Sequence, residues 1–245
     1  MISPDETLDD LIIGGLKLIQ PHEGYRFSLD SVLLAHFAVK KRVKLAVDLG
    51  SGNGIIPLIM AWRSPELEII GIEIQEQMVE RAQRSVLYNG LQQRISIIKG
   101  DIRNIKEYLS PGSVELVVSN PPYWCKGQGL ISHNHEEAIA RHELMVNLAE
   151  LIQAAAYLLP LKGSFCLIHR ADRLNEITKL CNANGIIPVR LRTVHSFPGQ
   201  EAQLILLEAQ KGERGSLKIL APLIIYSKPG KYSDEINNLY YGKGR

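Results

Sequence analysis

The tetrapeptide Asn120-Pro121-Pro122-Tyr123 directly follows the apolar run 114–119 and combines an amide, two prolines and an aromatic ring. Prolines have a fixed φ and no N–H group, so the backbone carbonyls around them are rigid and available as acceptors. The side-chain carbonyl of Asn120 and the backbone carbonyl of Pro121 can each accept one hydrogen of a planar amine. The Tyr123 ring can stack on a planar base that carries such an amine, and this stacking contributes about 1–3 kcal/mol to binding. Held in this way, an amine nitrogen directs its lone pair toward an incoming carbon and needs no strong base, because its proton can leave afterwards.

A glycine-rich turn, Asp48-Leu49-Gly50-Ser51-Gly52-Asn53-Gly54, follows an earlier apolar run. Its glycines permit a tight turn and a close approach of the backbone to a ligand. The spacing is GxGxG, which differs from the GxGxxG that seats a pyrophosphate on a helix N-terminus. The Asp48 carboxylate would repel a phosphate but suits the cationic sulfonium and ammonium groups of S-adenosylmethionine. Taken alone, the motif also fits an ordinary glycine-rich turn.

Two further acids follow later apolar runs. Glu73 lies roughly 20 residues past the glycines, where an acid can accept both hydroxyls of a ribose. Asp101 is placed to accept a hydrogen bond from the adenine amine of the cofactor, and capping of a helix over 102–109 is the alternative. Ile74 and Ile102, which follow the two acids, are expected to line the cofactor site, and Asn120 is expected to border it as well. Acids at the carboxyl ends of parallel strands share one rim of the sheet, where ligands bind in open α/β folds.

The elements that must position these residues are predicted between residues 45 and 184. Short, continuous apolar runs alternate with helical periods, which is typical of strands buried on both faces of a parallel sheet. The predicted strands are 45–48, 69–73, 95–99, 114–119 and 164–168, and the predicted helices are 55–62, 75–89, 144–159 and 171–184. The pattern indicates a doubly wound, Rossmann-like α/β fold.

Two β-rich runs, 189–194 and 202–208, leave no room for a crossover helix between them. We expect them to pair antiparallel as a hairpin at one edge of the sheet. This favours the seven-stranded sheet of methyltransferases over the dehydrogenase version of the fold, which continues with further βα units. Before the core, residues 11–19 predict a small Gly-Gly hairpin and residues 31–40 a helix. The expected organisation is an N-terminal hairpin and helix (1–44), a methyltransferase core (45–210) and a docked C-terminal tail (211–245).

Size and composition limit the class of protein. A chain of 245 residues suits one α/β domain with short additions, and 45% hydrophobic content is ordinary for a globular core. No apolar stretch approaches the roughly 20 residues that cross a bilayer, and no secretion pattern opens the chain. Cys125, Cys166 and Cys181 form no CxxC pair, so we expect reduced thiols, no metal site and a cytoplasmic location.

The net charge of +2 decides nothing, but basic residues gather at two places. One is the run 40–44, and the other is the tail with Lys228, Lys231, Lys243 and Arg245. A nucleic-acid surface is one interpretation. The other interpretation for the first cluster is that it lies at a helix C-terminus, where its cations complement the helix dipole and keep the surface hydrated.

Over residues 26–208 the chain resembles class I S-adenosylmethionine-dependent methyltransferases with a (D/N/S)-PP-(Y/F/W) motif, which modify planar amines. Within that group it is similar to the bacterial tRNA1(Val) (adenine-37-N6)-methyltransferase family. Three local matches carry the narrower resemblance: the segment 20–34 with its Phe-x-x-Asp-x-Val-Leu-Leu pattern, the segment 140–143, and the tail 221–226 followed by Tyr232.

The resemblance implies S-adenosylmethionine as cofactor and methyl transfer to N6 of the adenine just 3′ of a tRNA anticodon. It also implies that Phe27 lies over the cofactor and that the anticodon loop is the partner. A loop base can be extruded into a pocket at a lower cost than a base in a duplex.

Three alternatives stay open. Glutamine methyltransferases of release factors use the same Asn-Pro-Pro-Tyr to hold a carboxamide nitrogen, but they carry a sizeable helical domain before the core, where this chain has only residues 1–44. Guanine-N2 methyltransferases of rRNA commonly have a duplicated core, which this length excludes. An RNA-binding protein with a silent cofactor pocket is the non-enzyme alternative, and cofactor binding without methyl transfer to any RNA would favour it.

Overall fold

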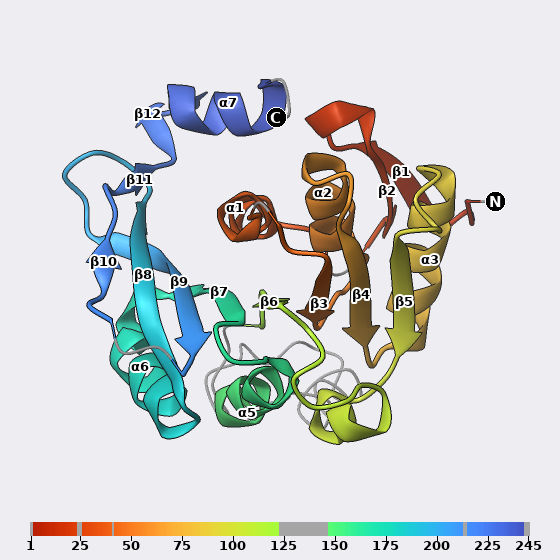
Figure 1. The fold of residues 1–245 in the computed structure, drawn as a ribbon. Helices are drawn as coiled ribbons and strands as arrows, with labels where there is room; N and C mark the ends of the chain where they lie inside the picture. The colour runs from red at the N-terminus through yellow and green to blue at the C-terminus, as the bar shows by residue number, and fades with distance from the viewer. Residues whose placement is uncertain (1, 24–25, 41, 123–146, 213–214, 243–245) are drawn as a thin grey trace, which may run out of the picture.

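The computed structural model describes residues 2–23, 26–40, 42–122, 147–212 and 215–242 (Figure 1). A central sheet separates two layers of helices, each with its own hydrophobic cluster. One layer contains α1 (Leu29–Ala38), α2 (Ile55–Arg63) and α3 (Glu76–Tyr88). The other contains the 3-10 helix η2 (Ile102–Glu107), α5 (Leu148–Leu158) and α6 (Leu174–Ala183), the last preceded by the short η3 (Ala171–Arg173). The doubly wound α/β prediction is therefore confirmed.

The main strands of the sheet follow the order β8-β9-β7-β6-β3-β4-β5. They are β3 (Leu45–Leu49), β4 (Glu68–Glu73), β5 (Ile95–Lys99), β6 (Leu116–Ser119), β7 (Ser164–Arg170), β8 (Ile186–His195) and β9 (Ala202–Lys211). The strands from β5 to β7 pair in parallel, and β9 is antiparallel to both β7 and β8. The predicted C-terminal hairpin is confirmed. It does not leave β8 as a bare edge, because β10 (Lys218–Ile219) and β11 (Leu223–Ile224) pair with β8 in parallel.

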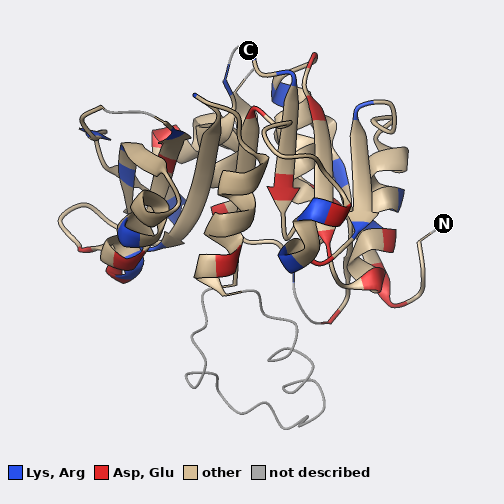
Figure 2. Ribbon diagram, turned by 60° about the horizontal axis from the view of Figure 1, so that its bottom comes forward, with Lys and Arg blue, Asp and Glu red and all other residues tan. Residues whose placement is uncertain are grey.

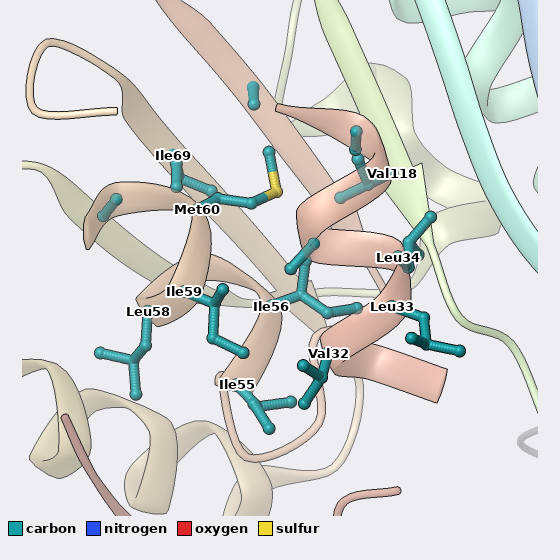
Figure 3. Close-up of a cluster of buried hydrophobic side chains, with 14 of the residues drawn as sticks. Val32, Leu33, Leu34, Ile55, Ile56, Leu58, Ile59, Met60, Ile69 and Val118 are labelled. Carbon is teal, nitrogen blue, oxygen red and sulfur yellow. The ribbon is translucent and has the colours of Figure 1, made fainter. Parts of the chain in front are cut away.

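The strands are apolar on both sides because both layers of helices cover them. Successive residues of β3 and β6 point to opposite faces, so Ala46 and Val118 join the cluster of α1, α2 and α3, while Val47 and Val117 join that of η2, α5 and α6. Figure 3 shows the first cluster, where side chains of α1 and α2 meet Val118 and a residue of β4. Burying each valine, leucine, isoleucine or methionine side chain of these clusters stabilises the fold by about 1.5–3 kcal/mol.

The N-terminal hairpin lies elsewhere than predicted. Its strands are β1 (Glu6–Asp10) and β2 (Lys17–Pro21), and the residues between them form a 3-10 turn, η1 (Ile13–Gly15). The prediction of a hairpin within 11–19 is wrong in its bounds, because the glycines serve a longer turn packed on α2. A Cβ at Gly14 would lie 2.0 Å from Nε1 of Trp62.

After β9 the chain returns along β8 and forms a second small hairpin, β12 (Tyr226–Lys228) and β13 (Lys231–Tyr232), followed by α7 (Asp234–Tyr241). The rings of Tyr226 and Tyr232 stack at 5.2 Å, and those of Tyr232 and Tyr240 at 6.1 Å, between centroids. Ile236 of α7 is buried in the cluster of α1, α2 and α3. None of the helices in the described part of the chain combines the length and hydrophobicity needed to cross a bilayer.

Candidate active site

The carboxyl ends of β3, β4, β5 and β6 form one rim of the sheet, and the polar residues singled out in the sequence lie there. Asp48 lies near the end of β3, Glu73 ends β4, Asp101 follows β5 by two residues, and Asn120 comes directly after β6. Since β3 lies between β4 and β6, Glu73 and Asn120 are separated by two strand spacings, roughly 10 Å. The topology thus brings the three acids and the Asn120 amide to the same rim of the sheet.

The glycine-rich turn after β3 is held by backbone hydrogen bonds. The N–H groups of Gly50 and Ser51 donate to the Ile72 carbonyl at 2.9 and 3.1 Å. Gly50, Gly52 and Gly54 have φ values of +80°, +55° and +85°, which favour glycine. A Cβ at Gly50 or Gly52 would meet no described atom within 4 Å, so the backbone is open to a ligand on that side.

Glu73 links the turn to the start of α3. One of its carboxylate oxygens accepts the N–H of Gly52, and the other accepts the N–H of Gln75, both at 2.9 Å. The residue is 6% exposed. Each carboxylate oxygen has more than one acceptor position, so these bonds fix the carboxylate without using up its capacity to accept ligand hydroxyls.

Asp48 is wholly buried, with 0% of its surface exposed. The Ser51 hydroxyl donates to its Oδ2 at 3.0 Å, while Oδ1 has no hydrogen-bond partner among the described residues. Burial, together with the nearby Glu73 carboxylate, raises the pKa of Asp48 to about 7. Asn53 is also buried, and within the described chain neither end of its amide has a partner. Buried acceptors without a described partner, such as the Oδ1 atoms of Asp48 and Asn53, fit a polar, cationic ligand, and the Asn53 NH2 group adds a donor.

Asp101 caps the 3-10 helix η2, the alternative that the sequence also allowed. Its Oδ1 accepts the backbone N–H of Arg103 at 2.9 Å, and the Arg103 guanidinium donates to both carboxylate oxygens, with Nη2 at 2.6 Å from Oδ2. These contacts lower the pKa of Asp101. Contact between Asp101 and an adenine amine stays a prediction, and it requires the carboxylate to share or release its arginine partner.

Asn120 is fixed from a distant part of the chain. Its Nδ2 amide donates to the Ser31 hydroxyl at 2.9 Å, and Ser31 lies in the first turn of α1. Ser119, just before it, donates its hydroxyl to the Leu49 carbonyl at 2.7 Å, which ties the end of β6 to β3. The sequence analysis missed Ser31, because 89 positions separate it from Asn120 and no local pattern marks the pair. Pro121 and Pro122 continue along the rim, whereas Tyr123 lies outside the described residues.

Phe27 is positioned by the N-terminal hairpin. Its backbone N–H donates to Oε1 of Gln20 at 2.7 Å, and the amide of Gln20 together with the guanidinium of Arg26 contacts Asp9. The Phe27 ring packs against the cluster of α1, α2 and α3. Phe27 therefore precedes the helix that carries Ser31, and its contact with a cofactor stays a prediction. Ile74 and Ile102 directly follow Glu73 and Asp101 on the rim, with Ile102 buried.

The two basic clusters have different surroundings. Lys40 contacts Glu208 and donates to Ser164 at 2.8 Å, at the amino end of β7, and Lys44 pairs with Glu66 at 3.1 Å. That end of the sheet lies opposite the rim. Lys228 and Lys231 are exposed and face each other across the β12–β13 hairpin. In the view of Figure 2, basic and acidic residues are interspersed rather than gathered on one face.

The described cysteines are buried. Burial raises the pKa of Cys166 and of Cys181 to about 12, so both thiols are protonated and unreactive at neutral pH. Cys125 lies outside the described residues, as does the segment 140–143. Within the described part of the chain, no group of three or more His, Cys, Asp or Glu side chains is placed to hold a metal ion.

Comparisons with known proteins identify the family of the chain and agree with its fold. Residues 29–176 match the family model described as "Methyltransferase small domain". A tRNA1(Val) (adenine(37)-N6)-methyltransferase of Porphyromonas gingivalis is 30% identical over 218 residues, covering 86% of this chain and 85% of that protein. A protein of the same name from Bacteroides thetaiotaomicron is 26% identical over 211 residues, covering 86% of each. The crystal structure of a predicted O-methyltransferase from Agrobacterium tumefaciens has a TM-score of 0.71 at 24% identity, covering 87% of this chain and 96% of that one. At that identity the structural likeness supports the fold alone.

Proposed function

The chain belongs to the methyltransferase small domain family and is an S-adenosylmethionine-dependent methyltransferase, and we propose that it methylates N6 of adenine 37 in a valine tRNA. The names of its relatives support the substrate. The observation that carries the chemistry is the position of Asn120, directly after β6 and on the same rim as Glu73. An amide and a proline carbonyl at this place suit an amine nitrogen that must face a methyl donor.

The residues of the rim fit the cofactor. The open backbone at Gly50 and Gly52 would hold its amino-acid portion, and Asp48 supplies a buried acceptor beside a cationic group. Glu73 would accept the two ribose hydroxyls, and Asp101 the adenine amine, with Ile74 and Ile102 beside the adenine. When bound, the cofactor supplies an electrophilic methyl group on a positively charged sulfur.

The protein's part in methyl transfer is to position an amine rather than to deprotonate it. The N6 amine of adenine is a poor nucleophile, because its lone pair is delocalised into the ring. Acceptance of its two hydrogens by Oδ1 of Asn120 and the carbonyl of Pro121 draws the nitrogen toward a tetrahedral geometry and directs the lone pair at the methyl carbon. The nitrogen loses one proton after the new bond has formed. Tyr123 is proposed to stack on the base.

One experiment tests the proposal. The protein is incubated with labelled S-adenosylmethionine and unmodified total tRNA, and the RNA is digested and analysed by mass spectrometry. We expect label only in N6-methyladenosine, at position 37 of a valine tRNA. Label in methylguanosine, or only in a release-factor peptide added to a parallel reaction, would overturn the substrate. Cofactor binding with no methyl transfer would indicate the silent RNA-binding alternative.

The affinity for S-adenosylmethionine is expected to rise with pH. With a pKa of about 7 in the free protein, Asp48 is largely neutral at pH 6, and it attracts a cationic ligand only when ionised. Binding then releases a proton, so affinity rises by up to about tenfold per pH unit below pH 7 and levels off above it. Calorimetric titrations in buffers of different ionisation enthalpy measure the released proton. In Asp48→Asn the affinity should lose this pH dependence, and an unchanged slope in that variant would contradict the prediction.

Lys228 and Lys231 are expected to contact the RNA backbone. The N–H of Tyr226 donates to the Ser196 carbonyl, directly after β8, so the hairpin lies at the carboxyl end of β8. Both lysines are exposed and pair across β12 and β13, and they belong to the basic tail that one interpretation of the sequence assigns to a nucleic-acid surface. Replacing both lysines by alanine should weaken tRNA binding. The slope of log K against the logarithm of salt concentration should become shallower by roughly one for each lysine.

The matched control for the two lysines is Lys44→Ala. Its side chain is 70% exposed and already pairs with Glu66 at 3.1 Å, so its removal should leave the salt slope unchanged. Filter binding at several salt concentrations gives all the slopes. Equal slopes for the double variant and for Lys44→Ala would place the RNA on another surface.

A further inference from the structure

The hydrogen bond between Asn120 and Ser31 joins the proposed amine-binding site to α1, a helix near the N-terminus of the chain. The bond is 2.9 Å long, from Nδ2 of Asn120 to Oγ of Ser31. Ser31 is 3% exposed, so this hydroxyl is withdrawn from solvent. Among the described residues, Ser119 also ties down the end of β6, because its hydroxyl donates to the Leu49 carbonyl.

The hydroxyl of Ser31 has a fixed position because α1 is packed over much of its length. Val32, Leu33 and Leu34, the next residues of the helix, are almost wholly buried against α2 and the sheet (Figure 3). The Ser31 N–H donates to the Ser28 carbonyl at 3.2 Å, in the first turn of the helix. The Oγ of Ser31 is thereby held at one place, where it accepts from the Asn120 amide.

The orientation of the Asn120 amide decides whether it meets the substrate with an acceptor or with a donor. The amide is planar, with the oxygen on one edge and the NH2 group on the other. An amine that offers two hydrogens needs the oxygen. A flipped amide would present its own hydrogens to those of the amine, and the amine would lose one of its two acceptors.

We propose that Ser31 is a positioning residue for methyl transfer, which holds the NH2 edge of Asn120 toward α1 so that Oδ1 meets the target amine. The proposal rests on the function proposed above for Asn120. It assigns a catalytic consequence to a segment that precedes the glycine-rich turn and contains none of the motif residues around Asn120. Since Phe27 lies two residues before the same helix, the N-terminal hairpin and α1 would support both the cofactor side and the amine side of the site.

The competing interpretation is that Ser31 serves folding only. Two substitutions separate the interpretations. Ser31→Ala removes the acceptor, and Ser31→Thr keeps a hydroxyl at the same place. If Ser31 positions the amide, Ser31→Ala should lower kcat about tenfold, the size of one lost hydrogen bond, with the KM for S-adenosylmethionine nearly unchanged. Ser31→Thr should recover most of the activity.

A double-mutant cycle with Asn120→Ala gives the sharper test. A residue that acts through Asn120 has nothing left to position once the amide is gone, so Ser31→Ala should cost about tenfold in the wild-type background and little in the Asn120→Ala background. Single-turnover rates with labelled cofactor and tRNA measure all four proteins. Equal losses in both backgrounds, or no loss in the first, would overturn the proposal.

The matched control is Ser85→Ala. Ser85 is also a buried helical serine whose hydroxyl accepts a long-range hydrogen bond, from the Ile19 N–H at 2.9 Å, but it lies in α3 and not at the rim. We expect Ser85→Ala to lower the melting temperature without changing kcat. If Ser31→Ala instead behaves like Ser85→Ala, its role is structural.

A measurement without substrate keeps this test independent of the proposed function. In protein labelled with 15N-asparagine, the side-chain NH2 signals of Asn120 are assigned as those that vanish in Asn120→Ala. Their hydrogen exchange should be at least tenfold faster in Ser31→Ala than in the wild type, and slow in Ser31→Thr. Unchanged exchange would overturn the inference. A wild-type protein that shows protected amide protons but methylates no tRNA would overturn the proposed substrate and leave the positioning role intact.

Discussion

Replacing Glu73 by alanine is expected to weaken the binding of S-adenosylmethionine at least 100-fold. Each charge-assisted hydrogen bond to a ribose hydroxyl contributes about 1.5–3 kcal/mol, so the loss of two corresponds to about 3–6 kcal/mol, or a factor of about 100 to 10⁴ in Kd. The substitution also removes the acceptors of the Gly52 and Gln75 N–H groups, which loosens the glycine-rich turn. Isothermal titration of the purified variant with the cofactor measures the change.

The control for this prediction is Glu76→Ala, three residues further along. The Glu76 side chain is 65% exposed and pairs with Lys99 at 2.7 Å, and an exposed ion pair of this kind contributes only about 0–1 kcal/mol. Its loss should leave cofactor binding within a few fold of the wild type. A Glu73→Ala protein that binds the cofactor as well as Glu76→Ala would remove Glu73 from the cofactor site.

The parallel core could be predicted closely from the sequence, because its strands are buried on both faces and so read as continuous apolar runs. The strand predicted over 95–99 has the same bounds as β5. The strand predicted over 164–168 ends too early, since His169 and Arg170 pair with Ile205 and Leu204 of β9. That extension depends on a partner strand, and no pattern within the run itself indicates it.

The candidate site, like the fold, could be predicted only in part from the sequence. The acids and Asn120 could be placed on one rim, because the carboxyl ends of parallel strands share an edge whatever their neighbours are. The contacts that tune them could not be predicted. The guanidinium of Arg103 on Asp101, and the Asp48 oxygen that has no partner among the described residues, depend on side-chain packing. The glycines of the N-terminal hairpin were misplaced for a similar reason, since the constraint on Gly14 comes from the distant ring of Trp62.

Replacing Asn120 by alanine is expected to lower the rate of methyl transfer and leave cofactor affinity nearly unchanged. The loss of Glu73 should instead lower cofactor affinity, because the two residues serve different steps. The cofactor should bind within a few fold of wild-type affinity, while the single-turnover rate of methyl transfer falls by about 10² to 10³, the usual effect of removing one preorganised polar contact to a transition state. Asn120→Ser, which keeps a short oxygen acceptor, should retain more activity than Asn120→Ala.

Asn147→Ala provides a matched asparagine control for this loss. Asn147 caps α5, accepting the Glu150 N–H at 2.9 Å, so its removal should cost about 1 kcal/mol of stability and leave the transfer rate unchanged. Methyl transfer by Asn120→Ala at a rate close to that of Asn147→Ala would mean that the amide does not hold the amine. A slow transfer rate at nearly normal cofactor affinity would therefore assign Asn120 to holding the amine and not to binding the cofactor.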